Sequence, residues 1–230
     1  MERIVIKIGG SILFLEDGSL NISLLRNYVT LFERLAKERK KLIIITGGGM
    51  IGKKYVSWAR ELGANEAICD LLGIQISRAN AFLLISALGE IAYPDVPTSI
   101  NDVIKALSTG RIVVLGGLQP GQSTNAVAAL VAESIRADVL IIATDVDGVY
   151  DLPPQMPDAK KLDRISYEDL LDMVLKHSKF AAGKYELFDP LSVLIMMRSK
   201  IPVRVVNGKD PENIVKVIKG EKIGTLVCQK

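Results

Sequence analysis

Four short segments of the 230-residue sequence combine glycine with lysine, hydroxyl or carboxylate side chains, and each follows an apolar run. They are Lys7-Ile8-Gly9-Gly10-Ser11, Thr46-Gly47-Gly48-Gly49, "GGLQPGQST" at 116–124 and "TDVDGVYD" at 144–151. One such loop alone is compatible with a tight turn between a strand and a helix. Together they predict phosphate binding, because glycine allows close approach of a ligand and N–H groups at helix starts attract anions.

The segment "IIITGGGMIGKKY" matches parts of two nucleotide-binding motifs. Gly47, Gly49 and Gly52 satisfy the dinucleotide pattern G-x-G-x-x-G, and Lys53 completes most of a P-loop. The P-loop reading fails because Lys54 stands where that motif needs a hydroxyl for Mg²⁺. The dinucleotide reading fails on context, since the acid about 20 residues on, Asp70, lies within a helical pattern instead of ending a strand.

The elements that position these segments are short apolar runs alternating with helical patterns. We expect strands at 4–8, 42–45, 112–115, 139–143, 203–206 and 226–227, and helices at 24–37, 51–62, 66–88, 124–135, 191–198 and 212–219. Continuous β-branched strands between helices predict a three-layer α/β/α sandwich around a mostly parallel sheet. The prolines of "YDLPPQMPDAKK" predict a surface loop near the site. The four glycine segments follow strands of such a sheet, where ligands bind at the carboxyl edge.

Composition excludes several classes of function. A net charge of +3 and 5% aromatic residues argue against nucleic-acid binding. A Cys/His metal site is implausible, because His177 is the only histidine and the two cysteines, Cys69 and Cys228, have no motif spacing. We also expect no membrane span, because no apolar run reaches about 18 residues, and a cytoplasmic protein without a signal peptide.

The segments "KIGGS", "TGGGMIGKKY", "CDLLGIQISRANA", "GGLQPGQSTNAVAALVAE" and "ATDVDGVYD", taken in order, resemble the amino-acid kinase superfamily, and within it the archaeal-type UMP kinases. The resemblance runs from Ile4 to about Thr225. It implies one domain over 1–230, with the acceptor nucleotide on the part up to about residue 137 and ATP on the part from about 138. It further implies transfer of phosphate from ATP with Mg²⁺ to UMP, and a homohexamer.

By resemblance, the catalytic residues are Lys7, Lys53 and Asn125. ATP would contact Gly9, Gly10, Ser11, Gly49, Lys53, Thr144, Asp145 and Tyr150. UMP would contact Gly48, Asp70, Leu118, Gln119, Pro120, Gly121, Gln122, Ser123 and Thr124. Ser123 and Thr124 are also suitable helix N-caps, and the two roles are compatible.

The sequence departs from many relatives at four positions. Asn125 replaces an aspartate that organises the catalytic lysine, and Asp145 replaces a frequent asparagine. Pro153 and Leu194 replace an aspartate and a lysine near ATP, for which Asp151 and Lys184 are candidate substitutes.

Two kinds of alternative remain open. The chain could act on acetylglutamate, isopentenyl phosphate or carbamate with the same fold, or it could be a non-catalytic nucleotide-binding regulator. The absence of histidine in Met50-Ile51-Gly52-Lys53 argues against isopentenyl phosphate, and Asp70 with "LQPGQST" favours a nucleotide acceptor. We also expect a homo-oligomer, because the helix at 24–37 would expose apolar residues such as Phe32.

Overall fold

A computed structural model describes residues 2–15, 17–178 and 187–230, without the side chains of 177 and 178. One seven-stranded sheet, in the order β3-β2-β1-β4-β6-β7-β5, runs through it. Its strands are β1 (Arg3–Ile8), β2 (Lys41–Thr46), β3 (Val113–Leu115), β4 (Val139–Thr144), β5 (Arg164–Ser166), β6 (Val203–Asn207) and β7 (Thr225–Cys228). All neighbouring strands are parallel except β6 and β7, which are antiparallel. The predicted mostly parallel sheet is confirmed.

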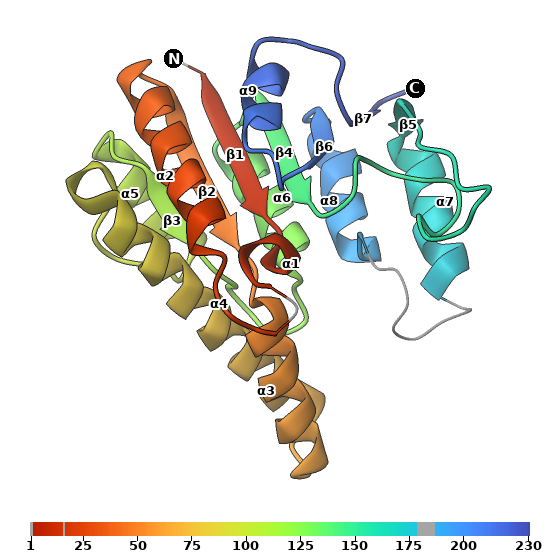
Figure 1. Cartoon of the computed structure of the whole chain (residues 1–230), viewed down its shortest axis with the longest axis horizontal. Helices are drawn as coiled ribbons and strands as arrows, with labels where there is room; N and C mark the ends of the chain where they lie inside the picture. The colour runs from red at the N-terminus through yellow and green to blue at the C-terminus, as the bar shows by residue number, and fades with distance from the viewer. Residues whose placement is uncertain (1, 16, 179–186) are drawn as a thin grey trace.

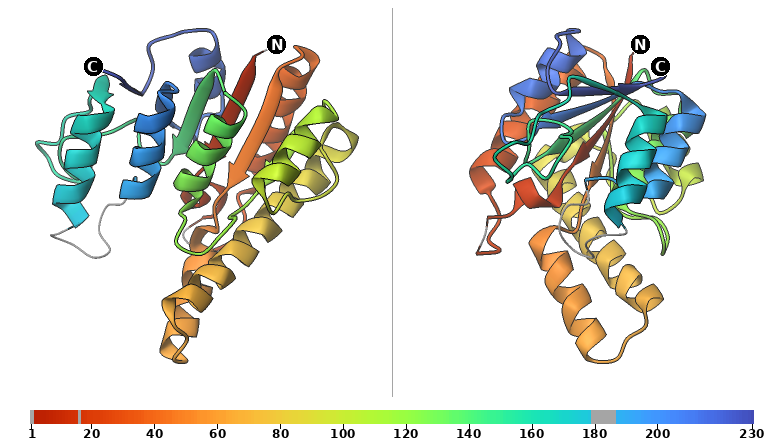
Figure 2. Two further views of the ribbon diagram at one scale, coloured as in Figure 1. Left: turned by 180° about the vertical axis from the view of Figure 1, so that it is seen from behind. Right: turned by 90° about the vertical axis from the view of Figure 1, so that its right-hand side faces the viewer.

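Helices cover both faces of this sheet, which confirms the three layers (Figures 1 and 2). Their bounds are α1 (Gly10–Leu13), α2 (Ile22–Lys37), α3 (Gly49–Glu61), α4 (Glu66–Leu88), the short 3-10 helix η1 (Gly89–Ile91), α5 (Ile100–Ser108), α6 (Thr124–Ser134), α7 (Tyr167–Ser178), α8 (Pro190–Ser199) and α9 (Glu212–Ile218). Side chains of α5, α6, α7 and α8 form one buried cluster with the sheet, and those of α1, α2, α4 and α9 form the other.

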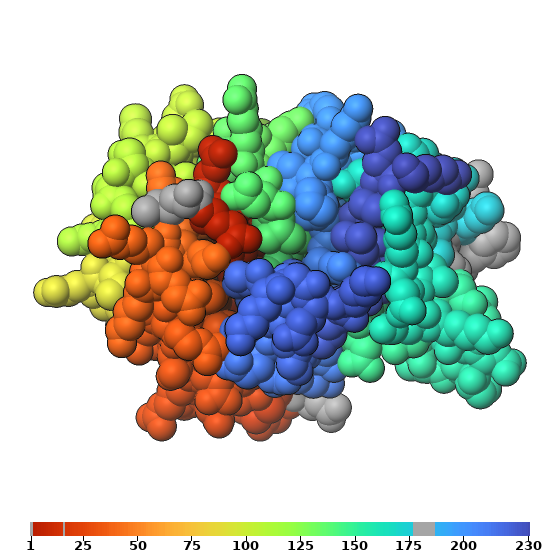
Figure 3. Space-filling view, turned by 90° about the horizontal axis from the view of Figure 1, so that it is seen from above, coloured from red at the N-terminus to blue at the C-terminus, as the bar shows by residue number. Residues whose placement is uncertain are grey.

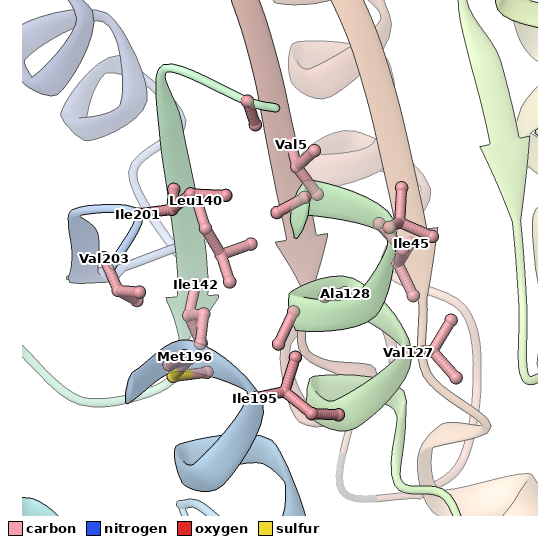
Figure 4. Close-up of a cluster of buried hydrophobic side chains, with 14 of the residues drawn as sticks. Val5, Ile45, Val127, Ala128, Leu140, Ile142, Ile195, Met196, Ile201 and Val203 are labelled. Atoms are coloured by element: carbon pink, nitrogen blue, oxygen red, sulfur yellow. The ribbon is translucent and has the colours of Figure 1, made fainter. Parts of the chain in front are cut away.

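Alternation along β1 divides its side chains between the two clusters. Ile4, Ile6 and Ile8 face α2 and α9, whereas Val5 lies in the cluster under α6 and α8 (Figure 4). Since successive side chains of a strand point to opposite faces, Lys7 follows Val5 on the side of α6 and α8. Strands β1 to β4 are buried on both faces, which explains why the sequence shows continuous apolar runs there.

The expected elements are present, with small shifts at their ends, and α4 has the bounds predicted for it. The helices α1, α5 and α7 and the strand β5 were not predicted from the sequence. The proline-rich segment 151–160 contains no helix or strand, as predicted. The expectation that Phe32 is exposed is wrong: its side chain is fully buried, because α2 packs against α4 as well as against the sheet.

The helices α3 and α4 form a hairpin that projects beyond the carboxyl ends of the strands (Figures 1 and 2). Both chain ends lie at the opposite edge of the sheet, on the face seen in Figure 3. The hairpin exposes large apolar side chains, including Tyr55, Trp58, Leu62 and Phe82. By length and composition α4 could span a membrane, although Asp70, Arg78 and Asn80 interrupt its apolar residues.

Candidate functional site

Five loops meet at the carboxyl edge of the sheet. The loop after β1 is tied to β4, because Gly9 N–H donates to the carbonyl of Ala143 (2.8 Å). The loop after β6 is tied to the end of β4 in the same way, since Gly208 N–H donates to the carbonyl of Thr144 (2.7 Å). These bonds, with the β1–β2 and β2–β3 pairings, bring the four glycine segments predicted from the sequence to one edge.

The glycines of the first two loops allow a backbone contact that no larger residue would permit. A Cβ atom on Gly10 would lie 2.3 Å from the nitrogen of Gly49. Gly49 itself has a φ of 65° and would bring a Cβ within 2.5 Å of the Phe14 ring. A Cβ on Gly47 would lie 3.7 Å from Oγ1 of Thr124, so the start of α6 adjoins the same two loops.

Lys7 is a partly buried cation at the end of β1. Its strand neighbours are Ile45 of β2 and Ile142 of β4, and both lie in the cluster beneath α6 and α8 (Figure 4). Burial lowers the pKa of Lys7 to about 8, and the charge of Asp145 opposes this effect. The charge of Asp145 only partly makes up for the solvation that the Lys7 ammonium has lost. Binding of an anion beside it is therefore favourable, because the anion would replace the lost solvation.

Asn125 lies in the first turn of α6 and is 8% exposed. Its amide nitrogen donates to the carbonyl of Leu187 (2.7 Å), and its Oδ1 is buried without a hydrogen-bond partner among the described residues. An unsatisfied buried acceptor costs about 1–3 kcal/mol, so a donor from a ligand or a lysine would be stabilising here. Asn125 carries no charge, and the carboxylate that raises the pKa of Lys7 is that of Asp145, on the loop after β4.

Lys53 lies in the second turn of α3, after the loop of Gly48 and Gly49, and its side chain is exposed. No ion pair of Lys53 occurs within the part of the chain that the structure describes. Its position next to the glycine loop is compatible with the predicted contact with phosphate, and its catalytic role stays a prediction.

Asp70 on α4 directly contacts the acceptor segment (residues 116–124), which includes the predicted UMP contacts 118–124. Its Oδ2 accepts a hydrogen bond from the N–H of Gly121 (2.8 Å), although the two residues are 51 positions apart. The structure therefore brings together two parts of the predicted UMP site. Gly121 has a φ of 78°, which turns the chain at this point.

The acceptor segment ends at the first turn of α6. Oγ of Ser123 caps this helix by accepting the N–H of Ala126 (3.0 Å), as predicted, and its hydroxyl donates to Asp189. Asp189 in turn caps α8 through the N–H of Ser192 (2.9 Å). Oε1 of Gln122 is buried and unpaired in the described structure. Two helix starts and an unsatisfied acceptor thus lie together.

The loop after β4 forms the predicted ATP side. The hydroxyl of Thr144 donates to Asp145 (3.1 Å), and Thr144 is 6% exposed. Tyr150 lies farther along and pairs with Lys161 in an isolated bridge. Asp151 uses its carboxylate to accept the N–H of Lys160 (2.8 Å), which leaves one oxygen for other contacts. Lys184 falls outside the described residues.

Several residues at this edge were not identified from the sequence. The amide of Asn207 donates to Asp147 (2.8 Å) and ties the loop after β6 to the predicted ATP loop. On α4, the backbone carbonyl of Ser77 accepts from Thr46 (2.9 Å), and Asn80 donates to the carbonyl of Gly47 (2.8 Å). Arg78 donates to two carbonyls of the acceptor segment. The sequence "GKD" at 208–210 follows an apolar run and could have identified the β6 loop as part of this edge. Polar residues inside a helix, such as those of α4, gave no comparable signal.

Comparisons with known proteins agree with this arrangement. Residues 2–207 match the sequence profile of the amino acid kinase family. The uridylate kinase of Hyperthermus butylicus is 45% identical over 225 residues, covering 97% of each chain. The uridylate kinase of Methanothermobacter thermautotrophicus is 44% identical over 226 residues, covering 98% of each.

Solved structures show the same fold. The crystal structure of uridylate kinase from Archaeoglobus fulgidus superposes with a TM-score of 0.87 at 39% identity, covering 99% of this chain and 100% of that one. The UMP kinase of Bacillus anthracis superposes with a TM-score of 0.81 at 23% identity, covering 100% and 96%. The second likeness supports the fold alone.

Proposed function

The chain belongs to the amino acid kinase family, and we propose that within it the protein is a uridylate kinase that converts ATP and UMP to ADP and UDP. Identity of 40–46% to uridylate kinases over nearly the whole length supports this assignment. The observation that carries it is the meeting of the four glycine loops around Lys7 and the start of α6. This edge offers N–H donors and a cation to two phosphate groups at once.

In the reaction, a phosphate oxygen of UMP attacks the γ-phosphorus of ATP, and the bond from that phosphorus to the β–γ bridging oxygen breaks. The protein's contribution is positioning and charge stabilisation. Lys7 lies between the loops assigned to the two substrates, so its ammonium would stabilise the charge on the group in transit. Lys53 would act from the α3 side, and Asn125 would orient Lys7 with its unpaired oxygen.

The substrate contacts proposed from the resemblance follow the two sides of this edge. ATP lies along Gly9, Gly10, Ser11, Gly49, Thr144, Asp145 and Tyr150. UMP lies along Gly48, Asp70 and residues 118–124. The hydrogen bond between Asp70 and Gly121 supports the second set. The two sets divide the single domain into an acceptor part, to about residue 137, and an ATP part beyond it.

The proposed metal is Mg²⁺ carried by ATP. No group of three or more His, Cys, Asp or Glu side chains able to hold a metal occurs among the described residues. Mg²⁺ is commonly bound through substrate phosphates and water with few protein ligands, so the ATP phosphates would hold it here. Bound there, the ion would neutralise charge on the ATP phosphates.

We propose a homo-oligomer, a hexamer by resemblance, and place the contact on the α3–α4 hairpin. Trp58 is 52% exposed and Phe82 is 56% exposed, which is unusual for large apolar side chains on a projecting element. Multi-angle light scattering at micromolar concentration tests this proposal, and a monomeric mass would refute it.

The hydrogen bonds of Asp70 and Asn80 to neighbouring loops favour α4 as a helix of the folded domain over a membrane span. The proposed location is the cytoplasm, without nucleic-acid partners.

A coupled assay of ADP release tests the function directly. The acceptors to compare are UMP, CMP, dUMP, acetylglutamate and isopentenyl phosphate, each with ATP and Mg²⁺. The expected result is the highest kcat/KM with UMP. Equal or better turnover of acetylglutamate or isopentenyl phosphate would replace the proposed substrate, and no turnover of any acceptor would favour a non-catalytic nucleotide-binding protein.

A further inference from the structure

Three residues of helix α4, Asp70, Ser77 and Arg78, bind the acceptor segment by hydrogen bonds. Oδ2 of Asp70 accepts the N–H of Gly121 (2.8 Å), and Oγ of Ser77 accepts the N–H of Gly117 (2.7 Å). Arg78 donates from Nε to the carbonyl of Gly117 (3.0 Å) and from Nη2 to the carbonyl of Leu118 (3.1 Å). Both backbone groups of Gly117 are therefore bonded to α4.

The acceptor segment also lies directly against the helix backbone. A Cβ on Gly116 would lie 2.6 Å from the nitrogen of Arg78, and one on Gly117 would lie 2.8 Å from Cγ1 of Ile74. Because no side chain separates the two backbones, the hydrogen bonds from α4 set the position of this loop. The same loop continues through residues 118–124 into the first turn of α6.

The guanidinium of Arg78 suits this contact for a geometric reason. It is planar and can donate in parallel to two neighbouring carbonyls, whereas a lysine ammonium offers a point charge without that fork. Arg78 is partly buried and forms no ion pair with a carboxylate in the described part of the chain. Both of its side-chain hydrogen bonds within the described part of the chain go to the carbonyls of Gly117 and Leu118.

We propose that Arg78 is a positioning residue for the acceptor nucleotide, which fixes the carbonyls of Gly117 and Leu118 and so sets residues 118–124 before UMP binds. This inference rests on the proposed function for the identity of the acceptor. The loops after β1 and β6, on the proposed ATP side, are tied to β4 by the bonds from Gly9 to Ala143 and from Gly208 to Thr144, and among the described residues Arg78 donates no side-chain hydrogen bond to these loops. Loss of Arg78 therefore acts on one substrate.

Steady-state kinetics of Arg78→Lys and Arg78→Met, with both substrates varied, tests the proposal. We expect the KM for UMP to rise about tenfold in both variants, as for loss of hydrogen bonds from a charged donor, while the KM for ATP stays within about twofold. The matched control is Arg34→Met, because Arg34 of α2 forms a comparable double contact with Glu212 of α9 (2.7 and 2.9 Å), on helices other than α3 and α4. This control should leave both KM values unchanged.

Two results would overturn the proposal. If Arg78→Lys behaves like the wild type, the charge alone matters and the two-carbonyl contact does not. If the KM values for ATP and UMP rise together with a fall in melting temperature, Arg78 supports the fold in general. If Arg78→Met does not fold, Arg78→Lys decides between these outcomes. Turnover of UMP by the wild type tests the proposed function separately, and if another acceptor is preferred, its KM replaces that of UMP in the comparison.

Discussion

Lys7 and Asp145 stand at the ends of two neighbouring parallel strands, and the charge of Asp145 raises the pKa of Lys7 against the effect of burial. Burial is the larger effect, and the pKa of Lys7 settles at about 8. A lysine that must be protonated to stabilise phosphate would therefore begin to lose its function within a measurable pH range. This relationship gives two predictions about the pH dependence of the reaction.

The first prediction concerns the alkaline side of the pH profile. The pH dependence of kcat/KM reports groups of the free enzyme, so kcat/KM for the wild type should fall as the pH rises above about 8. In Lys7→Arg the cation stays protonated, so whatever activity remains should show no such fall. A profile that is flat to pH 9.5 in the wild type, or a fall that persists in Lys7→Arg, would assign the effect to another group.

The second prediction concerns Asp145→Asn. Removing the carboxylate leaves burial unopposed, so the pKa of Lys7 should decrease and the fall in kcat/KM should move to lower pH. The control is Asp147→Asn, because Asp147 lies in the same loop but is bonded to Asn207 (2.8 Å), whereas the charge that raises the pKa of Lys7 is that of Asp145. An equal displacement in both variants would contradict the specific pairing of Lys7 with Asp145.

Much of the fold could be predicted because its signals are local. The helix α4 begins at a capping asparagine, Asn65, and ends at Gly89, so both of its bounds follow from sequence. The missed helices α5 and α7 carry comparable signals, since Ser99 with Asp102 and Ser166 with Asp169 form capping pairs. They did not lead to a prediction, because the expected elements were based on the longer apolar runs.

Apart from residues assigned by resemblance, such as Asp70 and Asn125, the site was predictable only where its residues lie next to glycine. The loops of Gly9 and Gly47 stand out because their composition is unusual, and the topology of the sheet then brings them together. Arg78 could not be identified, because an arginine inside a helix usually faces solvent and its contact lies 39 positions away. Phe32 was misassigned for a related reason: a helix that packs on two elements buries a wider face than its own periodicity indicates.

A third prediction concerns Asp70→Asn, which should weaken UMP binding by about tenfold or more and leave ATP binding nearly unchanged. A hydrogen bond to a charged group is worth about 1.5–3 kcal/mol, and Asp70 already bonds to the acceptor segment at Gly121. Titration calorimetry with each nucleotide separately measures both affinities. A loss of ATP affinity instead would place Asp70 on the donor side.

The fourth prediction is that Lys7→Ala lowers kcat by about 10²–10³, as for loss of one preorganised donor, while either KM changes much less. Two polyanionic substrates must come within bonding distance, and Lys7 is the cation that lies between their loops. A group that acts mainly in the transition state affects kcat more than KM. Initial rates with both nucleotides saturating give this comparison directly.

The melting temperature of Lys7→Ala separates catalysis from folding. Because the pKa of Lys7 is lower in the folded chain (about 8) than its ordinary value of 10.5, the unfolded chain binds more protons between these values. Keeping Lys7 charged below pH 8 therefore costs stability, and this cost diminishes as the pH rises through that window. Removing the ammonium at pH 7 relieves the cost and offsets the lost packing, so the melting temperature should hardly fall. If kcat stays near that of the wild type, Lys7 is only a strand-end lysine and the catalytic charge comes from Lys53 and the backbone N–H groups.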